Sequence, residues 1–504
     1  MSTNHQWRLI LAAVGILSVL TLLGCNRAEG DRHTAGASSE NRGKLPITTS
    51  SEEAKREFLQ GRDLADKLLI HDSLQHFEKA VALDPQFASA ELARANSSPT
   101  AKEFFEHLKK AVALSNNASE GERLLIQANE AGANGDTVKQ KEYLDKVATA
   151  YPNDERVQFT LGGYYFGQQD FPQAIEHYRK ATELDPTYSS AFNLLGYAYR
   201  QQGDYASAEQ AFKKYIELIP NDPNPYDSYA ELLLKEGKFD DSIAQYRKAL
   251  SIDPKFFASH LGIAADLTYL GKPAEALAEL QKAQENARND GERRGALFTA
   301  AVVYSDTGKY EKALQKMDEE YAVADKAKDS AAMAADLQAK GNILLQAQKY
   351  AQAKQTFEKS LQLINDSSLS QEIKANAAAV MHFNLARIAI GTKDFAQANG
   401  ELEEFRKAAD GSKNPVQLKQ VHEVAGTIAL AQKKYDDAVA ELSQANQQNP
   451  QNLFRLCQAY EGKSDATNAQ QYCSKAAGFN SLPQLPYAFV REQANKTTLA
   501  ANRK

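Results

Sequence analysis

Residues 155–256 repeat one pattern three times: ERVQFTLGGYYFGQQDFPQAIEHYRKATELDPTY (155–188), SSAFNLLGYAYRQQGDYASAEQAFKKYIELIPND (189–222) and PNPYDSYAELLLKEGKFDDSIAQYRKALSIDPKF (223–256). Pro152, Pro186, Pro220 and Pro254 follow one another at intervals of 34 residues. A proline at the end of an apolar-periodic stretch stops a helix, because it disfavours helical geometry in the preceding residue and donates no backbone hydrogen bond. Each period is therefore predicted to close with the end of a helix.

Small and large residues recur at fixed places when each period is numbered from 1 to 34. The small residues at the eighth and twentieth places are Gly162, Ala174, Gly196, Ala208, Ala230 and Ser242. Tyr178, Phe212 and Tyr246 stand at the twenty-fourth place. Small residues let two antiparallel helices approach, and the large rings fill the remaining space. Glycine at the fifteenth place supplies the turn between the helices, at Gly203, Gly237, Gly271 and Gly308.

This pattern resembles the tetratricopeptide repeat, a helix–turn–helix unit. The resemblance implies an all-α fold, an α-solenoid superhelix in which stacked units bury a continuous core and leave a concave face for function. Residues 51–290 are predicted to form an array with the 34-residue period. Beyond a boundary near Gly291 the units start near 294, 334, 379 and 419, so 291–480 is expected to hold elongated or degenerate repeats. Residues 481–504 are expected to form a C-terminal capping tail.

The first 24 residues have the features of an export signal. Arg8 precedes an apolar run from Leu9 to Leu23 that is short for a membrane span. The sequence LLGC at 22–25 resembles the lipobox of bacterial lipoproteins, which implies cleavage before Cys25 and lipidation of that residue. An uncleaved anchor, or an ordinary signal with an accidental cysteine, is the alternative. Residues 25–50 are rich in small and polar residues and are predicted to form a flexible tether.

The same resemblance predicts the location of the chain in the bacterial cell envelope. Residue 26 is Asn, whereas Asp at this place tends to hold such lipoproteins in the inner membrane. In a cell with two membranes, the protein is therefore expected at the outer membrane, facing the periplasm.

Composition and motifs exclude several classes of function. Lys and Arg number 59 against 65 Asp and Glu, a net charge of −6, with both signs interspersed, so nucleic-acid binding is not expected. The nine histidines form no HExxH motif, and no phosphate-binding glycine loop or nucleophile elbow is present. The sequence therefore predicts no catalytic residue, no metal site, no cofactor and no enzyme activity.

Protein binding is the predicted function, with a protein or peptide partner of unknown identity lying in the concave groove. In tetratricopeptide proteins the first helix of each unit lines this groove, and the resemblance implies a set of groove residues. These are Phe159, Phe166, Asn193, Tyr197, Arg200, Asp227, Glu231, Lys235, Leu261 and Tyr269. The alternative is that these residues are merely exposed in the groove and bind no partner. A competing hypothesis is an enzyme, or a small-ligand or glycan-binding envelope protein, with its site in the irregular segment 291–480.

Cys457 and Cys473 are the only cysteines after residue 25. They take the eighth and twenty-fourth places of a unit that begins near 450, so an antiparallel helix pair puts them at the same height. A disulfide is then possible in an exported protein. The alternative is that both are buried apolar residues that stay reduced.

Overall fold

The computed structural model describes residues 43–67 and 69–501, which contain 26 α-helices and no strand. The all-α solenoid predicted from the repeats is thus confirmed. The predicted signal peptide, the predicted lipidation site Cys25 and most of the predicted tether lie outside these residues. None of the helices in the described part is both long enough and apolar enough to cross a membrane.

The described chain divides into two compact units, 43–229 and 230–501, and each is described by itself. In the first unit α2 packs on α3, α4 on α5, α6 on α7, α8 on α9 and α10 on α11. These helices are α2 (Glu52–Asp66), α3 (Ile70–Leu83), α4 (Ala88–Ser97), α5 (Ala101–Leu114), α6 (Glu120–Ala133), α7 (Thr137–Ala150), α8 (Glu155–Gly167), α9 (Phe171–Leu184), α10 (Ser189–Gln202) and α11 (Tyr205–Leu218), with a 3-10 turn η2 (Ser115–Asn117). The division between the units falls within α12 (Asn224–Lys235).

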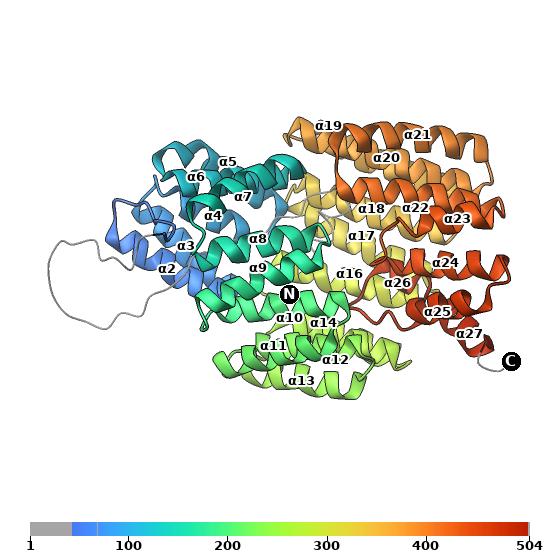
Figure 1. Cartoon of the computed structure of the whole chain (residues 1–504), viewed down its shortest axis with the longest axis horizontal. Helices are drawn as coiled ribbons and strands as arrows, with labels where there is room; N and C mark the ends of the chain where they lie inside the picture. The colour runs from blue at the N-terminus through green and yellow to red at the C-terminus, as the bar shows by residue number, and fades with distance from the viewer. Residues whose placement is uncertain (1–42, 68, 502–504) are drawn as a thin grey trace. The chain divides into compact units, whose positions relative to one another are not determined.

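The second unit continues the succession of helix pairs to the end of the chain (Figure 1). Its helices are α13 (Phe239–Ile252), α14 (Phe257–Tyr269), α15 (Pro273–Glu285), α16 (Asp290–Asp306), α17 (Tyr310–Lys326), α18 (Ser330–Gln346), α19 (Tyr350–Asp366), α20 (Gln371–Gly391), α21 (Phe395–Ser412), α22 (Pro415–Ala431), α23 (Tyr435–Leu442), α24 (Pro450–Gly462), α25 (Ala466–Ala477), α26 (Leu485–Ala488) and α27 (Arg491–Ala501). The predicted boundary near Gly291 falls inside α16, where the structure has no division.

The turn between the paired helices has one backbone conformation in every pair from α6 and α7 onward. The fifteenth-place glycines have positive φ, for example 90° at Gly203 and 68° at Gly308. Residues other than glycine adopt the same conformation at this place: Gln169, Gln348, Lys393, Lys433 and Ser464, with φ between 59° and 62°. The chain therefore keeps the turn geometry even where the residue type disfavours it.

The two helices of a pair approach most closely between the eighth and twenty-fourth places. A Cβ atom added to Gly341 would lie 2.3 Å from the Phe357 ring, and one added to Gly162 would lie 2.5 Å from the Tyr178 ring. Where the eighth place holds alanine, the twenty-fourth mostly holds a smaller side chain in the same buried cluster, as in Ala128 with Leu144. The volumes of the two residues are thus matched, as close packing of the core requires.

One boundary predicted from the sequence, the end of the tether at residue 50, is corrected by the packing. Leu45 is buried beside Leu125, and the Thr48 backbone N–H donates a 3.0 Å hydrogen bond to Glu122. Residues 43–50 therefore lie on the first repeats and do not belong to the tether, because one apolar side chain and several polar groups find partners there. After residue 290 the helices lengthen in three successive pairs, to 17 residues in α16 to α19 and to 21 and 18 residues in α20 and α21. The elongated repeats expected in 291–480 thus have longer helices in these three pairs, whereas α23, α24 and α25 have 8, 13 and 12 residues.

A double-mutant cycle tests the close approach of the helices. Gly341→Ala is expected to reduce the free energy of unfolding by about 1–3 kcal/mol, because its Cβ overlaps the Phe357 ring. Adding Phe357→Leu should recover part of this loss, since the pair then resembles Ala128 with Leu144. Urea unfolding of the two single variants and the double variant measures the coupling, and strictly additive losses would contradict the packing argument.

Candidate functional site

The first helices of successive pairs line one face of the second unit. Besides contacting its own pair, α14 touches α16, α20 touches α22 and α22 touches α24. Helices on the inside of a curved array are the ones that crowd one another in this way. We call the surface that α12, α14, α16, α18, α20, α22 and α24 present within the second unit the inner face.

The predicted groove residues of the first unit are mostly buried. The Phe159 ring packs between Tyr178 and Tyr188, with ring centroids 5.7 and 5.1 Å away. The Tyr197 ring is completely buried against Phe212. The sequence prediction that these two aromatic rings are presented to a partner is therefore corrected, because both rings complete the core of the repeats.

The remaining predicted groove residues differ in exposure. Asn193, Asp227 and Glu231 are buried. Phe166 and Arg200 of the first unit are partly exposed, and the Arg200 guanidinium lies 4.6 Å from the centre of the Tyr197 ring. Lys235, Leu261 and Tyr269 of the second unit are also partly exposed.

Lys235 and Tyr269 are brought together on the inner face by a segment of the chain itself. The Lys235 Nζ donates a hydrogen bond of 2.5 Å to the Phe479 carbonyl and lies 4.1 Å from the centre of the Phe479 ring. The Tyr269 hydroxyl donates to the Ser481 carbonyl, also at 2.5 Å. Residues 479–491, which we call the C-terminal segment, therefore lie against α12 and α14.

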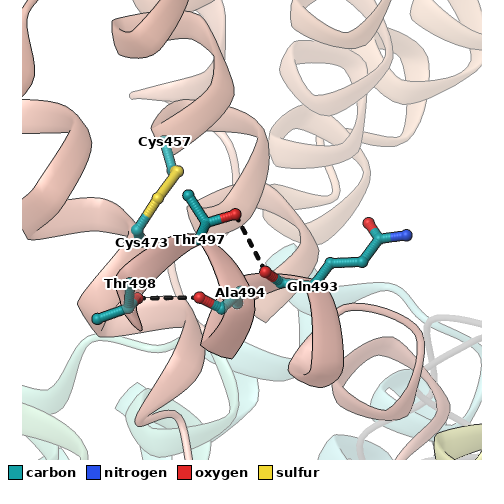
Figure 2. The surroundings of a disulfide bond; sticks show 6 residues. All are labelled: Cys457, Cys473, Gln493, Ala494, Thr497 and Thr498. Carbon is teal, nitrogen blue, oxygen red and sulfur yellow. Dashed lines mark hydrogen bonds between the residues drawn. A yellow bond between two sulfur atoms is a disulfide. The ribbon is translucent and has the colours of Figure 1, made fainter. Parts of the chain in front are cut away.

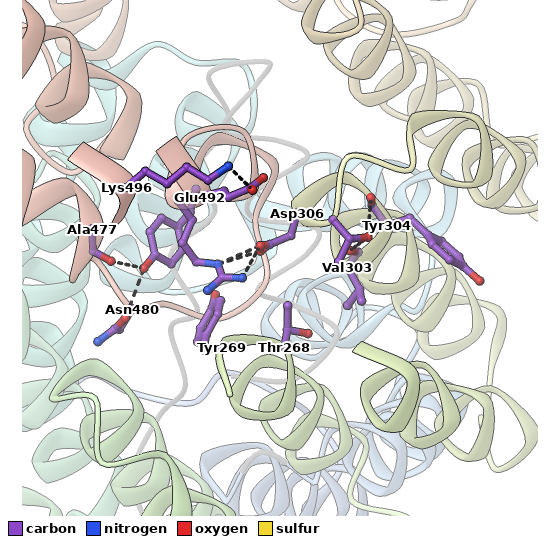
Figure 3. A network of polar contacts seen from close by, with 12 residues as sticks. Thr268, Tyr269, Val303, Tyr304, Asp306, Ala477, Asn480, Glu492 and Lys496 are labelled. Atoms are coloured by element: carbon purple, nitrogen blue, oxygen red, sulfur yellow. Dashed lines mark hydrogen bonds and ion pairs between the residues drawn. The ribbon is translucent and has the colours of Figure 1, made fainter. Parts of the chain in front are cut away.

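The same segment is fixed to α16 by an ion pair (Figure 3). Arg491 Nε donates to both carboxylate oxygens of Asp306, at 2.8 and 2.7 Å. The Asp306 side chain is 2% exposed. Burial raises the pKa of Asp306, and the guanidinium of Arg491 opposes this rise. A carboxylate in such surroundings is stable when a cation lies beside it.

A fourth contact joins the segment to α18, and apolar side chains complete the attachment. The Gln346 Nε2 donates to the Phe489 carbonyl at 3.4 Å. Leu485, Ala488 and Phe489 belong to a buried cluster that includes Val302 and Ile343. Helix α26 accordingly lies beside α16 and α24 (Figure 1). A small cavity remains between the segment and the inner face, lined by Thr268, Asp306 and Gln484.

These four contacts share one register. Lys235, Tyr269, Asp306 and Gln346 are the thirteenth residues of the units that begin at 223, 257, 294 and 334. Sequence reasoning included Lys235 and Tyr269 and missed the other two. Extending the thirteenth place into the longer units would have found Asp306 and Gln346.

Beyond the C-terminal segment the inner face carries a polar network with two arginines. Arg387 of α20 donates to the Asn342 side-chain oxygen at 2.7 Å, and Arg455 of α24 donates to Glu423 at 3.0 Å. Burial lowers the pKa of Arg387 to about 10, Glu423 opposes this fall and Arg455 adds to it. Arg387 is still a cation at neutral pH and is partly exposed. This part of the inner face can therefore attract a polar or acidic group.

Cys457 and Cys473 face each other across α24 and α25, with their sulfur atoms bonded and their Cα atoms 5.0 Å apart (Figure 2). They occupy the eighth and twenty-fourth places, so a covalent bond replaces the contact that a glycine and a ring make in Gly162 and Tyr178. Ala494 of α27 packs in the same buried cluster. The pair thus joins the two helices on which the C-terminal segment is mounted.

Paired histidines and glutamates link the two helices of several units, and sequence reasoning missed them. In each pair the residues lie 19 apart, at the fourth and twenty-third places, with a nitrogen–oxygen distance of 2.5–2.7 Å. The pairs are His76 with Glu57, His260 with Glu279, His382 with Glu401, and His422 with Glu441. The recurring separation is a signal that could have been read from the sequence. It explains these histidines as links between helices, without a metal.

Comparison with known proteins identifies the repeats. Models of the tetratricopeptide repeat match residues 159–223, 224–256 and 337–367. The chain contains tetratricopeptide repeats. Among the curated proteins none matches this sequence.

Three solved structures are among those to which parts of this chain are similar. MamA is 25% identical, with 33% of this chain and 91% of MamA covered and a TM-score of 0.28. A tetratricopeptide repeat protein from Parabacteroides merdae is 15% identical, with 57% and 99% covered and a TM-score of 0.35. YrrB, described as having an unusual peptide-binding site, is 19% identical, with 36% and 91% covered and a TM-score of 0.25.

Asp266 gives the second unit a dependence on pH that can be measured. It lies completely buried on α14, and its pKa is raised to about 8, because burial disfavours the ionised form more than the nearby Ser242 favours it. Unfolded aspartate has a pKa of about 3.9, so the folded chain keeps a proton that the unfolded chain loses. Stability is therefore lost as the pH rises from about 4 to about 8.

Asp266→Asn is expected to abolish this part of the pH dependence. As the pH rises from 4 to 8, the free energy of unfolding of the variant should increase by roughly 2–4 kcal/mol relative to that of the wild type, because asparagine does not titrate. Urea unfolding at several pH values measures the difference. Asp241→Asn, which alters an exposed residue of α13, is the control. Parallel curves for the wild type and Asp266→Asn would contradict the assignment.

The oxidation state of the cysteine pair is a separate prediction. We expect no free thiol at Cys457 or Cys473 in protein purified without a reducing agent, because the two sulfurs lie within bonding reach. Closing a loop of about 15 residues stabilises the fold by roughly 3 kcal/mol in the chain-entropy model. Thiol counting under denaturing conditions tests this, and two free thiols would exclude the bond.

Proposed function

We propose that the protein is a scaffold that binds another polypeptide along its inner face. One observation carries this proposal: four successive first helices use the same place in the repeat to hold a single stretch of chain. Three of the four contacts end on backbone carbonyl oxygens, of Phe479, Ser481 and Phe489. Any polypeptide offers such oxygens, so the face has the chemistry to bind main chain.

We place the entry of the partner at the part of the inner face that the C-terminal segment leaves open. Arg387 on α20 and Asn342 on α18 lie there, and Arg387 is partly exposed. The mixed character of this surface, with amide groups and a guanidinium, suits hydrogen bonding to peptide groups and acidic side chains. A repeat array of this kind presents an extended concave surface, which suits the binding of another protein.

Photo-crosslinking in intact cells tests the proposal. The photoreactive residue p-benzoylphenylalanine in place of Arg387 is expected to capture a discrete polypeptide. The same residue in place of Lys407, which is exposed on the second helix α21, is the matched control and should capture none. Equal crosslinking from both positions, or crosslinking from neither, would contradict binding along the inner face.

We also propose that the chain is a lipoprotein of the bacterial cell envelope, anchored through Cys25 and, in a cell with two membranes, at the outer membrane. The support is the sequence of residues 1–26, with its apolar run, its lipobox-like LLGC and Asn26. A lipid anchor would leave the repeats outside the bilayer, where a partner protein can reach them.

Cys25→Ser is expected to abolish labelling by a fatty-acid analogue and to move the protein into the soluble fraction, because several acyl chains are needed for firm anchoring and each buried methylene contributes roughly 0.8 kcal/mol. Metabolic labelling followed by membrane fractionation measures both effects. A variant that is still labelled and still sediments with membranes would refute the anchor.

A further inference from the structure

The C-terminal segment has the position of a ligand, although it belongs to the same chain. It follows α25, ends at the start of α27, and crosses the inner face between these two points of attachment. Its own regular structure is limited to α26, which has four residues. Pro483 and Pro486 interrupt the backbone, so carbonyl oxygens of the segment are free to accept bonds from the inner face.

The polar contacts between the segment and the inner face are of two kinds. Those of Lys235, Tyr269 and Gln346 end on carbonyl oxygens and do not depend on the side chains of the segment. The ion pair between Arg491 and Asp306 does depend on a side chain. Asp306 is buried and takes two hydrogen bonds from Nε of a single guanidinium, so an occupant without a cation would leave it uncompensated.

Aromatic side chains are the second feature that the inner face requires of a bound peptide. The Tyr269 ring lies 5.5 Å from the ring of Tyr487 and 5.2 Å from the Arg491 guanidinium. The Phe479 ring lies 5.7 Å from that of Tyr487. The inner face thus holds a peptide that combines aromatic side chains with an arginine.

We propose that residues 479–491 are a built-in ligand of the inner face and that the partner is a polypeptide of the same chemistry, with aromatic residues and an arginine for Asp306, which binds by displacing them. This inference rests on the proposed function, that the inner face binds a polypeptide. Phe479, Tyr487 and Val490 of the segment are buried in the same cluster as Cys457 and Cys473. The last pair keeps contacts of its own when the segment leaves, because α27 packs on α25 and the Cys457–Cys473 bond joins α25 to α24. Because the C-terminal segment already occupies the inner face, a partner displaces it only when the partner makes the same contacts with that face.

A peptide supplied in trans tests the displacement. The probe is a fluorescein-labelled synthetic peptide FNSLPQLPYAFVREQ, which is residues 479–493 of this chain. By fluorescence anisotropy it should bind the full chain carrying Arg491→Ala at least tenfold more tightly than the wild type, whose own segment occupies the face. Lys496→Ala, which alters an exposed residue of the same helix α27, is the matched control and should bind like the wild type.

A charge exchange identifies the site of binding. Adding Asp306→Asn to Arg491→Ala should weaken peptide binding at least tenfold. A peptide with Asp in place of its Arg should bind poorly to Arg491→Ala and better to Arg491→Ala with Asp306→Arg. Equal binding to the wild type and Arg491→Ala, or binding indifferent to residue 306, would overturn the proposal.

A second variant distinguishes weaker attachment of the segment from loss of folding. Phe479→Ala weakens the other end of the segment and leaves the ion pair intact, so it should also raise peptide affinity. If circular dichroism shows that both Arg491→Ala and Phe479→Ala unfold, the segment is part of the core and the proposal is wrong. A failed peptide experiment together with crosslinking at Arg387 would reject displacement while leaving the proposed function standing.

Discussion

The close approach of paired helices at the eighth and twenty-fourth places is the contact on which the rest of the structure depends. Glycine there admits a ring, as in Gly341 with Phe357, whereas alanine mostly accompanies a smaller side chain. Ala230 with Tyr246 departs from this rule, and Gly262 supplies the missing space, since a Cβ there would lie 2.0 Å from the Tyr246 ring. Matched volumes keep the spacing of the helices constant from unit to unit, and therefore keep the inner-face residues in register.

The last unit solves the same packing problem with covalent chemistry. Cys457 and Cys473 stand at the two places that elsewhere hold a small and a large residue, sixteen positions apart. A terminal pair lacks a following repeat to cover its second helix. Here α27 covers α25, with Ala494 buried in the same cluster as the two cysteines. The disulfide and α27 thus hold the last helix pair together, and the C-terminal segment runs from this pair across the inner face.

The sequence predicted the repeats well because their pattern arises from local contacts. The proline period, the small residues and the fifteenth-place turn all concern neighbours within one unit. The turn also occurs without glycine, at Gln348 and Lys393, because tertiary packing imposes positive φ on these residues. The boundary of the first unit was missed, since Leu45 and Thr48 find their partners through contacts with residues far along the chain.

The candidate site was predicted less well than the fold. The position in the repeat indicated which helices carry the predicted groove residues, but not which side chains on them reach the surface. Phe159 and Tyr197 turn into the core, whereas Lys235 and Tyr269 contact the C-terminal segment. The ion pair of Asp306 with Arg491 joins residues that are 185 positions apart, and no local sequence pattern predicts it. Contacts of such long range depend on the curvature of the array, which the period of the sequence does not specify.

The central claim is that the inner face holds the C-terminal segment as a ligand that can be displaced. Amide hydrogen exchange of the wild type and Asp306→Asn tests this claim most directly, because it measures local opening of each part of the chain. The account predicts at least tenfold faster exchange in residues 479–490 of the variant, with unchanged exchange in α20 and α22. Unchanged exchange in the segment, or equal acceleration throughout the second unit, would contradict it.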